Sequence, residues 1–190
     1  MKRVAGSPDP KLSLGQQVQT APFLALAALE VDQLTKLGVR ESLTTEQSIP
    51  LAAGLHITNV VNPGMVFGIS VPPAVSLFLP LAMIVASVVL YWRFERSNST
   101  LLDVGIGLFV GGSLGNVVDR IVYGHVTDFI AFVPSGGSTG TVFNLADACI
   151  ILGIVILEVF LIRLVLNRGR TRKYSIPRLL GTRDSLEEGR

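Results

Sequence analysis

Long apolar stretches separated by short polar segments form most of the chain. The clearest stretch covers residues 71–92, and no Lys, Arg, Asp or Glu occurs anywhere between Glu46 and Arg93. A bilayer crossing needs about 20 predominantly apolar residues, so this stretch predicts one membrane-spanning helix. Residues 100–118 and 146–166 are long and apolar enough to predict two more.

The first candidate span, residues 21–37, is the weakest because Glu30, Asp32 and Lys36 lie in its second half. The uncharged residues 12–29 supply the missing length. A cleavable secretory signal would also place an apolar stretch after a basic start, but no clear small-residue cleavage site follows this one. We therefore predict an all-α membrane protein with four transmembrane helices.

The composition agrees with a membrane protein and excludes several other classes. Charged residues make up 16% of the chain, against roughly 25% in ordinary soluble proteins. The low charge argues against intrinsic disorder, and the net charge of +2 argues against a nucleic-acid partner. Cys149 is the only cysteine and there are two histidines, so the sequence offers no disulfide framework and no Cys/His metal site. We expect no metal and no cofactor.

Basic residues are distributed unevenly between the two ends of the predicted spans. With four spans, the tails of residues 1–20 and 167–190 lie on one side, together with the loop that contains Arg93 and Arg96. That side carries all but three of the 16 basic residues. Cytoplasmic segments are enriched in Lys and Arg, so both tails should be cytoplasmic. Residues 21–166 should form the membrane domain, and the basic C-terminal tail is interpreted as a topology anchor.

In this orientation, polar side chains gather at the external ends of the spans and in the external loops. Ionisable groups in or beside a bilayer are energetically costly, so such a cluster is a functional-site hypothesis. The asparagines among them could hold a peptide backbone or could cap structural elements. The cluster comprises Asp32, Asn62, Asn116, Asp119, Arg120, Asp128, Asn144 and Asp147.

Two of the acids in this cluster have a basic residue nearby in the sequence. Asp32 precedes Lys36 by four residues, the favourable order for an ion pair on one helix face, so these two should neutralise each other. Arg120 follows Asp119 directly and can stabilise its charge, which favours a structural role for Asp119.

The other two acids, Asp128 and Asp147, have no Lys or Arg within three positions, although His125 lies three residues before Asp128. Asp147 begins the last span, and Asp128 lies in the loop that leads to it. If this loop folds back over the helix end, the two acids meet and share one proton. Such a pair can activate water and protonate a leaving amine, as in an aspartic protease. Two separately solvated acids at a membrane surface are the alternative.

Other candidate nucleophiles fit catalysis less well. On a helix, Cys149 points about 200° away from Asp147. The pattern G-x-S-x-G occurs around Ser113 and Ser138, but neither serine has the strand-to-helix context of a nucleophile elbow. We therefore do not favour a cysteine or serine mechanism.

Glu158 supports a different functional hypothesis. It lies on nearly the same helix face as Asp147 but deeper in the predicted span. It could pair with Arg163, or it could carry protons along the helix if the protein were a proton-coupled transporter. A transporter and a structural membrane scaffold are therefore the two alternatives to a protease.

Glycines and small residues mark two further features. Gly107, Gly111 and Gly115 repeat every four residues, which predicts close packing of the third span against another helix. Residues 134–141, PSGGSTGT, lie between the two candidate acids. We interpret them as a surface connection, with gating of the site as the alternative.

Five sequence blocks carry a resemblance to a known family. They are DQLTK at 32–36, VVNPGMVFG at 60–68, GGSLGNVVDR at 111–120, GHVTDF at 124–129 and FNLAD at 143–147. In this order they resemble the signature blocks of bacterial lipoprotein signal peptidase, also called signal peptidase II. Met65, Val66 and Thr127 depart from the commoner residues of the family, and the basic C-terminal tail is longer than the core needs.

The resemblance implies an aspartic endopeptidase of the bacterial inner membrane, with four helices and a small external β-rich cradle. The substrate would be a prolipoprotein, cleaved just before a cysteine that carries diacylglycerol, and the cyclic peptide globomycin would inhibit the enzyme. Membrane lipid would surround the substrate. The family's catalytic acids correspond to Asp128 and Asp147. Supporting or substrate-binding roles fall to Asp32, Lys36, Asn62, Gly112, Asn116, Asp119, Arg120, Asn144 and Ala146.

Overall fold

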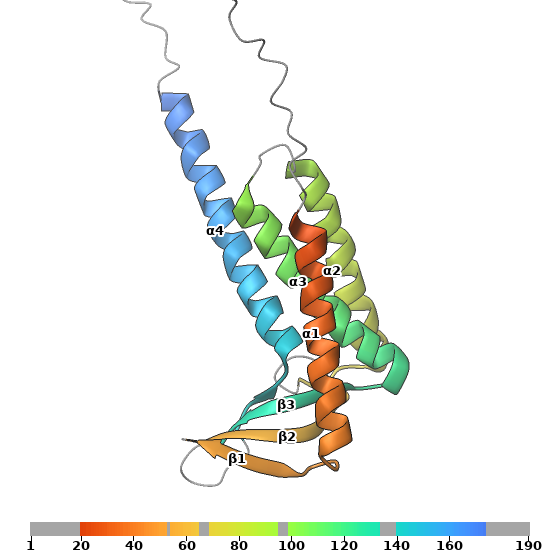
Figure 1. Cartoon of the computed structure of the whole chain (residues 1–190). Helices are drawn as coiled ribbons and strands as arrows, with labels where there is room; N and C mark the ends of the chain where they lie inside the picture. Colours follow the sequence, from red (N-terminus) through yellow and green to blue (C-terminus); the bar gives the residue numbers. More distant parts are fainter. Residues whose placement is uncertain (1–19, 53, 65–68, 95–98, 134–139, 174–190) are drawn as a thin grey trace, which may run out of the picture.

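A computed structural model shows four helices and one small antiparallel sheet (Figure 1). It describes residues 20–52, 54–64, 69–94, 99–133 and 140–173. Most of both predicted tails and of the 134–141 segment lies outside these residues, as do Met65, Val66, Arg96 and Ser138. The last helix extends to Lys173, seven residues into the predicted C-terminal tail. The elements are α1 (Thr20–Ser42), β1 (Ser48–Ala52), β2 (Leu55–Asn62), α2 (Pro73–Phe94), α3 (Thr100–Tyr123), β3 (Val126–Phe132), β4 (Val142–Phe143) and α4 (Leu145–Lys173).

The four predicted helices are present, and α3 is the central one. It packs against α1, α2 and α4. Three helices, α2, α3 and α4, are long and apolar enough to cross a membrane. The apolar side chains of α2 and α4 are mostly exposed, which suits contact with lipid, whereas most of α3 is buried. The helix α1 is not apolar enough to count as a membrane span by the same criteria, because it contains several charged residues. Two of these residues, Asp32 and Lys36, are fully buried inside the bundle.

Glycines on α3 allow both neighbouring helices to approach closely. A Cβ atom at Gly111 would collide with the carbonyl oxygen of Ala25 on α1, and Gly107 faces the same helix. On an adjacent face, a Cβ atom at Gly112 would lie 2.5 Å from the carbonyl oxygen of Ala146 on α4. The predicted packing role of the glycine stripe is therefore confirmed. This close approach brings α1 and α4 together on either side of α3.

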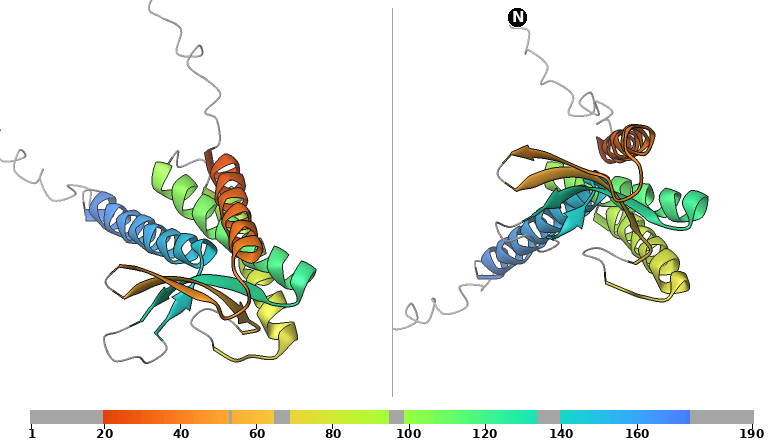
Figure 2. Two further views of the ribbon diagram at one scale, coloured as in Figure 1. Left: turned by 60° about the horizontal axis from the view of Figure 1, so that its bottom comes forward. Right: turned by 90° about the horizontal axis from the view of Figure 1, so that it is seen from below.

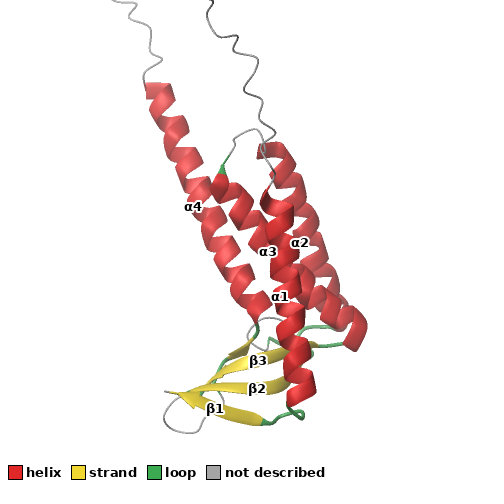
Figure 3. Ribbon diagram, viewed as in Figure 1, coloured by secondary structure: helices red, strands yellow, loops and turns green. Residues whose placement is uncertain are grey.

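The sheet lies at one end of the helix bundle, with strand order β1-β2-β3-β4 (Figures 2 and 3). Gly124 ends α3 in a left-handed conformation, with φ of 78°, and its N–H donates to the carbonyl oxygen of Arg120. This turn leads directly into β3, where Asp128 pairs with Val60 of β2. The β-rich cradle that the resemblance implied corresponds to this sheet, and β3 holds Asp128 against the ends of the helices.

Candidate active site

The start of α4 positions Asp147 through reciprocal hydrogen bonds with Asn144. Asn144 directly precedes the helix, and its Oδ1 accepts the backbone N–H of Asp147 at 2.9 Å. Asp147 Oδ2 in turn accepts the backbone N–H of Asn144 at 3.4 Å. This arrangement resembles a capping box, which satisfies N–H groups that have no partner within the helix. The spacing N-x-x-D in the sequence is thus also a local structural device.

Asp128 receives two amide donors, one on each carboxylate oxygen. Asn144 Nδ2 donates to Oδ1 at 2.6 Å, and Asn62 Nδ2 donates to Oδ2 at 2.8 Å. Asn62 is oriented for this by its own Oδ1, which accepts the N–H of Gly64 at 2.9 Å. Asn144 therefore binds both acids, Asp128 through its side chain and Asp147 through its backbone. Asp128 and Asp147 are 2% and 3% exposed as whole residues, so both are buried. The loop does fold back, because Asp128 shares the partner Asn144 with Asp147.

Asn116 links Asp147 to a buried cation. Lys36 Nζ donates to Asn116 Oδ1 at 3.0 Å, and Asn116 Nδ2 donates to Asp147 Oδ1 at 2.8 Å. The ammonium group fixes the orientation of the amide, because Lys36 can only donate. The sequence suggested that no fixed cation lies near the two acids. In the structure, Lys36 is one side chain away from Asp147, although the two residues are far apart in the sequence.

Lys36 is itself surrounded by acids. Its Nζ lies 2.8 Å from Asp32 Oδ2, which confirms the predicted pair, and 3.2 Å from Asp119 Oδ2. All three side chains are fully buried. Asp32 Oδ1 also accepts the backbone N–H of Ala146 at 2.9 Å, and Asp119 Oδ2 accepts that of Thr127 at 3.0 Å. The network therefore joins α1, α3, α4 and β3 around the site.

Asp119 is paired with two cations, Lys36 and Arg40. The Nη1 of Arg40 lies 3.5 Å from Asp119 Oδ1. Its sequence neighbour Arg120 points elsewhere. Arg120 Nη1 donates to the carbonyl oxygen of Asn116 at 3.1 Å, and Nη2 donates to that of Gly64 at 2.8 Å. Helix geometry explains this difference, because adjacent residues on a helix face different directions. Arg120 thus holds the turn after β2 against α3.

Burial changes the acidity of Asp128. Removal from water raises its pKa from the usual 3.8 to about 6. The hydrogen bond from Asn62 acts in the opposite direction, and the nearby charge of Asp147 raises the pKa further. Asp128 also lines a cleft of about 500 Å³, together with the end of β2, the start of α2 and residues 140–142. A group that titrates near neutral pH and borders a cleft is a candidate for proton transfer.

Comparisons with known proteins identify the family of this chain. Residues 24–163 match a family model described as signal peptidase (SPase) II. The chain belongs to the signal peptidase II family. Members of the family are aspartic peptidases, and this protein is accordingly a multi-pass membrane enzyme with lipoprotein signal peptidase activity.

Two curated members of the signal peptidase II family and one solved structure align with most of this chain. The lipoprotein signal peptidase of Halothermothrix orenii is 34% identical over 140 residues, which are 73% of this chain and 92% of that protein. The enzyme of Moorella thermoacetica is 36% identical over 140 residues, covering 72% and 89%. A solved structure of a bacterial membrane enzyme superposes with a TM-score of 0.67 at 26% identity, covering 80% of this chain and 92% of that one.

The other residues that the sequence analysis singled out are not part of the acid pair. Gly112 and Ala146 meet at the contact between α3 and α4, as described above. Cys149 is half-buried and faces Gly112 rather than the site, and Ser113 is buried within α3. Glu158 is exposed on α4, apart from the cluster of acids. Among the residues that the structure describes, Glu158 forms no ion pair with Arg163.

Sequence reasoning missed two members of this signal peptidase II site, Gln33 and Arg40. Gln33 Nε2 donates to Asp32 Oδ2 at 3.2 Å, to the carbonyl oxygen of Gly115 at 3.1 Å and to Asp119 Oδ1 at 3.2 Å. The local signals for Gln33 were its place next to Asp32 and its presence in the block DQLTK. Arg40 lies one turn beyond Lys36 on the same helix face, and that spacing could have identified it.

Proposed function

We propose that Asp128 and Asp147 form the catalytic pair of this peptidase. We further propose that the substrate is a prolipoprotein whose cysteine carries diacylglycerol, and that cleavage occurs just before this cysteine. The observation that carries the proposal is that Asn144 hydrogen-bonds to both carboxyl groups, by its side chain to Asp128 and by its backbone to Asp147. Two buried acids on one partner, beside a cleft, suit the activation of a water molecule.

In the proposed mechanism, the two carboxyl groups hold one proton between them. The ionised group accepts a proton from water while the water oxygen attacks the carbonyl carbon of the scissile bond. The protonated group donates its proton to the carbonyl oxygen, which gives a tetrahedral diol. Collapse of this diol breaks the C–N bond. The departing nitrogen receives a proton from the pair, and one hydroxyl of the diol returns its proton to the pair as the new carboxyl group forms. No metal or cofactor is needed for these steps.

The other residues support this chemistry by position. Three amides hold the carboxylates, and each amide oxygen is occupied by a donor, so that its nitrogen faces an acid: Asn62, Asn116 and Asn144. Asp32, Lys36 and Asp119 hold the helices around the site. Gly112 and Ala146 let α3 and α4 approach, and Arg120 fixes the turn at the cleft.

We place the protein in the bacterial inner membrane with residues 1–20 and 167–190 in the cytoplasm and residues 21–166 as the membrane peptidase domain. The uneven distribution of basic residues supports this orientation. The acid pair then lies near the external face, at the end of the bundle that carries the sheet (Figure 3). The diacylglycerol of the substrate stays in the bilayer while the scissile bond reaches Asp128 and Asp147. Globomycin is expected to compete for the same cleft.

The direct test is to incubate the purified protein with a diacylglyceryl prolipoprotein and to follow the masses of the products. We expect two fragments, with the new N-terminus at the lipid-modified cysteine, and inhibition by globomycin. The same precursor without lipid is the matched control and should be cleaved much more slowly. Well-folded protein that leaves the lipidated precursor uncut, or cuts it elsewhere, would contradict the proposed substrate.

The raised pKa of Asp128 predicts the pH dependence of the free enzyme. Because burial raises this pKa to about 6, the proton is retained up to that pH and is lost above it. We expect kcat/KM to fall as the pH rises through about 6, since kcat/KM reports the ionisation of the free enzyme. Bound substrate excludes further water, so the corresponding limb of kcat should lie at higher pH. Initial rates across the pH range measure both, and a pH-independent kcat/KM would contradict this assignment.

A further inference from the structure

Arg40 completes the charge balance of the buried network beneath the acid pair. Asp32 and Asp119 are both fully buried, and both lie within ion-pair distance of Lys36. One cation cannot neutralise two carboxylates. Arg40 supplies the second positive charge, with its Nη1 3.5 Å from Asp119 Oδ1. With Arg40 present, the four side chains carry no net charge.

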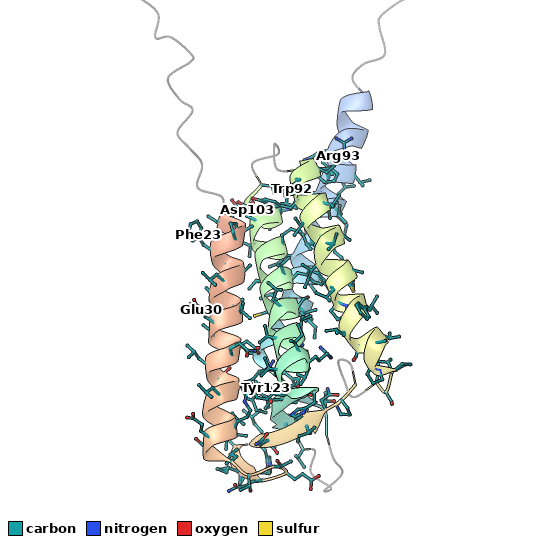
Figure 4. The ribbon with its side chains drawn as sticks, turned by 90° about the vertical axis from the view of Figure 1, so that its right-hand side faces the viewer. Phe23, Glu30, Trp92, Arg93, Asp103 and Tyr123 are labelled. Carbon is teal, nitrogen blue, oxygen red and sulfur yellow. The ribbon has the colours of Figure 1, made fainter. Side chains whose placement is uncertain are left out.

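Several contacts hold Arg40 in place. Its Nη1 donates to Thr127 Oγ1 at 3.0 Å, in the residue next to Asp128. Its guanidinium carbon lies 4.4 Å from the centre of the Tyr123 ring, within the range of a cation–π contact. Figure 4 shows Tyr123 near the sheet, at the end of the bundle where the site lies. The side chain of Arg40 is only 19% exposed, so its charge is partly shielded from solvent.

The charge balance affects Asp147 through the hydrogen bonds of Lys36. The ammonium group has three N–H donors, and Asp32, Asp119 and Asn116 each take one. If Asp119 lost its second cation, its attraction for Lys36 would compete with the weaker attraction of the neutral amide of Asn116. The Asn116 oxygen would then lose its charged donor and keep only Asn144 Nδ2, at 3.2 Å, so the amide nitrogen would be held less firmly on Asp147.

We propose that Arg40 is a positioning residue of the peptidase, which neutralises Asp119 and thereby keeps Lys36 and Asn116 aligned on Asp147. Arg40 contacts neither reacting carboxylate in the hydrogen bonds and ion pairs of the described residues. The inference rests on the proposed catalytic role of Asp128 and Asp147, and it adds a residue that the sequence blocks of the family do not contain.

The sign of the expected pH effect follows from the charges around the pair. Apart from Arg40, the charged groups are Asp32 and Lys36 of α1, Asp119 and Arg120 of α3, Asp128 of β3 and Asp147 of α4. Glu41, Tyr123 and His125 line the external hollow beside Arg40. Loss of the Arg40 charge makes the surroundings more negative and favours the protonated form of Asp128. The pH profile should therefore move to higher pH.

The test compares Arg40→Gln, Arg40→Lys and the control Arg93→Gln, which removes the same charge at the far end of the bundle (Figure 4). Arg40→Gln should lower kcat between about twofold and thirtyfold, the range for coupled networks, with KM unchanged. Its kcat/KM profile should move up by roughly half a pH unit or more, for a nearby charge at an effective dielectric constant of about 20. Arg40→Lys should restore the wild-type profile, and Arg93→Gln should match the wild type in both measurements.

A wild-type pH profile and kcat in folded Arg40→Gln would overturn the proposal, as would an equal shift in Arg93→Gln. Should Arg40→Gln fail to fold, Tyr123→Leu carries the test, because it removes the ring beneath the guanidinium and leaves the charge. Tyr123→Leu should lower kcat by about twofold or more with KM unchanged, and an unchanged kcat would count against the proposal.

Asp128→Asn, assayed in parallel, distinguishes a failure of the proposed catalytic pair from a failure of the proposed role of Arg40. If Asp128→Asn is active, the catalytic pair itself is refuted; if it is inactive while Arg40→Gln behaves as wild type, only the role of Arg40 is refuted.

Discussion

Replacement of either Asp128 or Asp147 by asparagine is expected to lower kcat by about 10³-fold to 10⁴-fold, the range that general acid–base catalysis contributes. An amide has nearly the size of the carboxyl group but cannot take a proton from water at neutral pH or return it to the leaving nitrogen. Each acid accepts hydrogen bonds on both of its oxygens, so an NH₂ group at either position would also face another donor. Single-turnover cleavage of a lipidated precursor measures the loss.

Asp103→Asn is the matched control for these two variants. Asp103 lies in the first turn of α3, at the end of the bundle away from the sheet (Figure 4), and accepts a hydrogen bond from Thr20 Oγ1 at 3.0 Å. The control should retain wild-type kcat. The double variant Asp128→Asn/Asp147→Asn should be little worse than either single variant, because residues that act as a unit give strongly non-additive losses. Independent, additive losses would contradict a shared proton.

Much of this site could be predicted because its signals are local. The four helices follow from apolar stretches of sufficient length, and the pair of Asp32 and Lys36 follows from a spacing of four residues on one helix. The absence of basic sequence neighbours singled out Asp128 and Asp147. These are properties of short segments, which the rest of the chain modifies little.

Partners from distant elements could not be predicted in this way. The sequence assigned Arg120 to Asp119 because the two are adjacent, whereas Asp119 faces Lys36 and Arg40 of α1. Likewise, the position of Lys36 one amide away from Asp147 depends on how closely α1 and α4 pack on α3. Such contacts join residues many positions apart, and no pattern of spacing within one segment encodes them.

The orientation of the asparagines shows a second limit. From the sequence, a side-chain amide can present either its oxygen or its nitrogen to an acid. In the structure, Lys36, the N–H of Gly64 and the N–H of Asp147 each donate to one amide oxygen, and every amide nitrogen donates to an acid. Asn144 Nδ2 also donates to Asn116 Oδ1, at 3.2 Å. Polar residues that looked equally suited to binding a peptide are thus held in place by the fold, which keeps the two carboxyl groups fixed before any substrate arrives.

Lys36→Met is expected to destabilise the folded protein by about 3–5 kcal/mol, the range for removing one partner from a buried ion pair. The side chains have similar lengths, but methionine leaves Asp32 and Asp119 buried with fewer donors and only the partly exposed Arg40 as a cation. For a protein of this size the midpoint of thermal unfolding in detergent should fall on the order of 10 °C. Arg163→Met, at an exposed position on α4, is the control and should change the midpoint little.

The size of the loss in Lys36→Met should depend on the carboxylates that remain. If uncompensated charge is the cause, then adding Asp32→Asn to Lys36→Met should recover part of the midpoint, although Asp32→Asn alone should lower it. Residues in one network couple in this way, by about 0.5–3 kcal/mol. If the double variant instead lost the sum of the two single losses, the cost would lie in packing rather than in charge. The buried lysine would then fill space between α1 and α3 without serving as the counter-charge of Asp32 and Asp119.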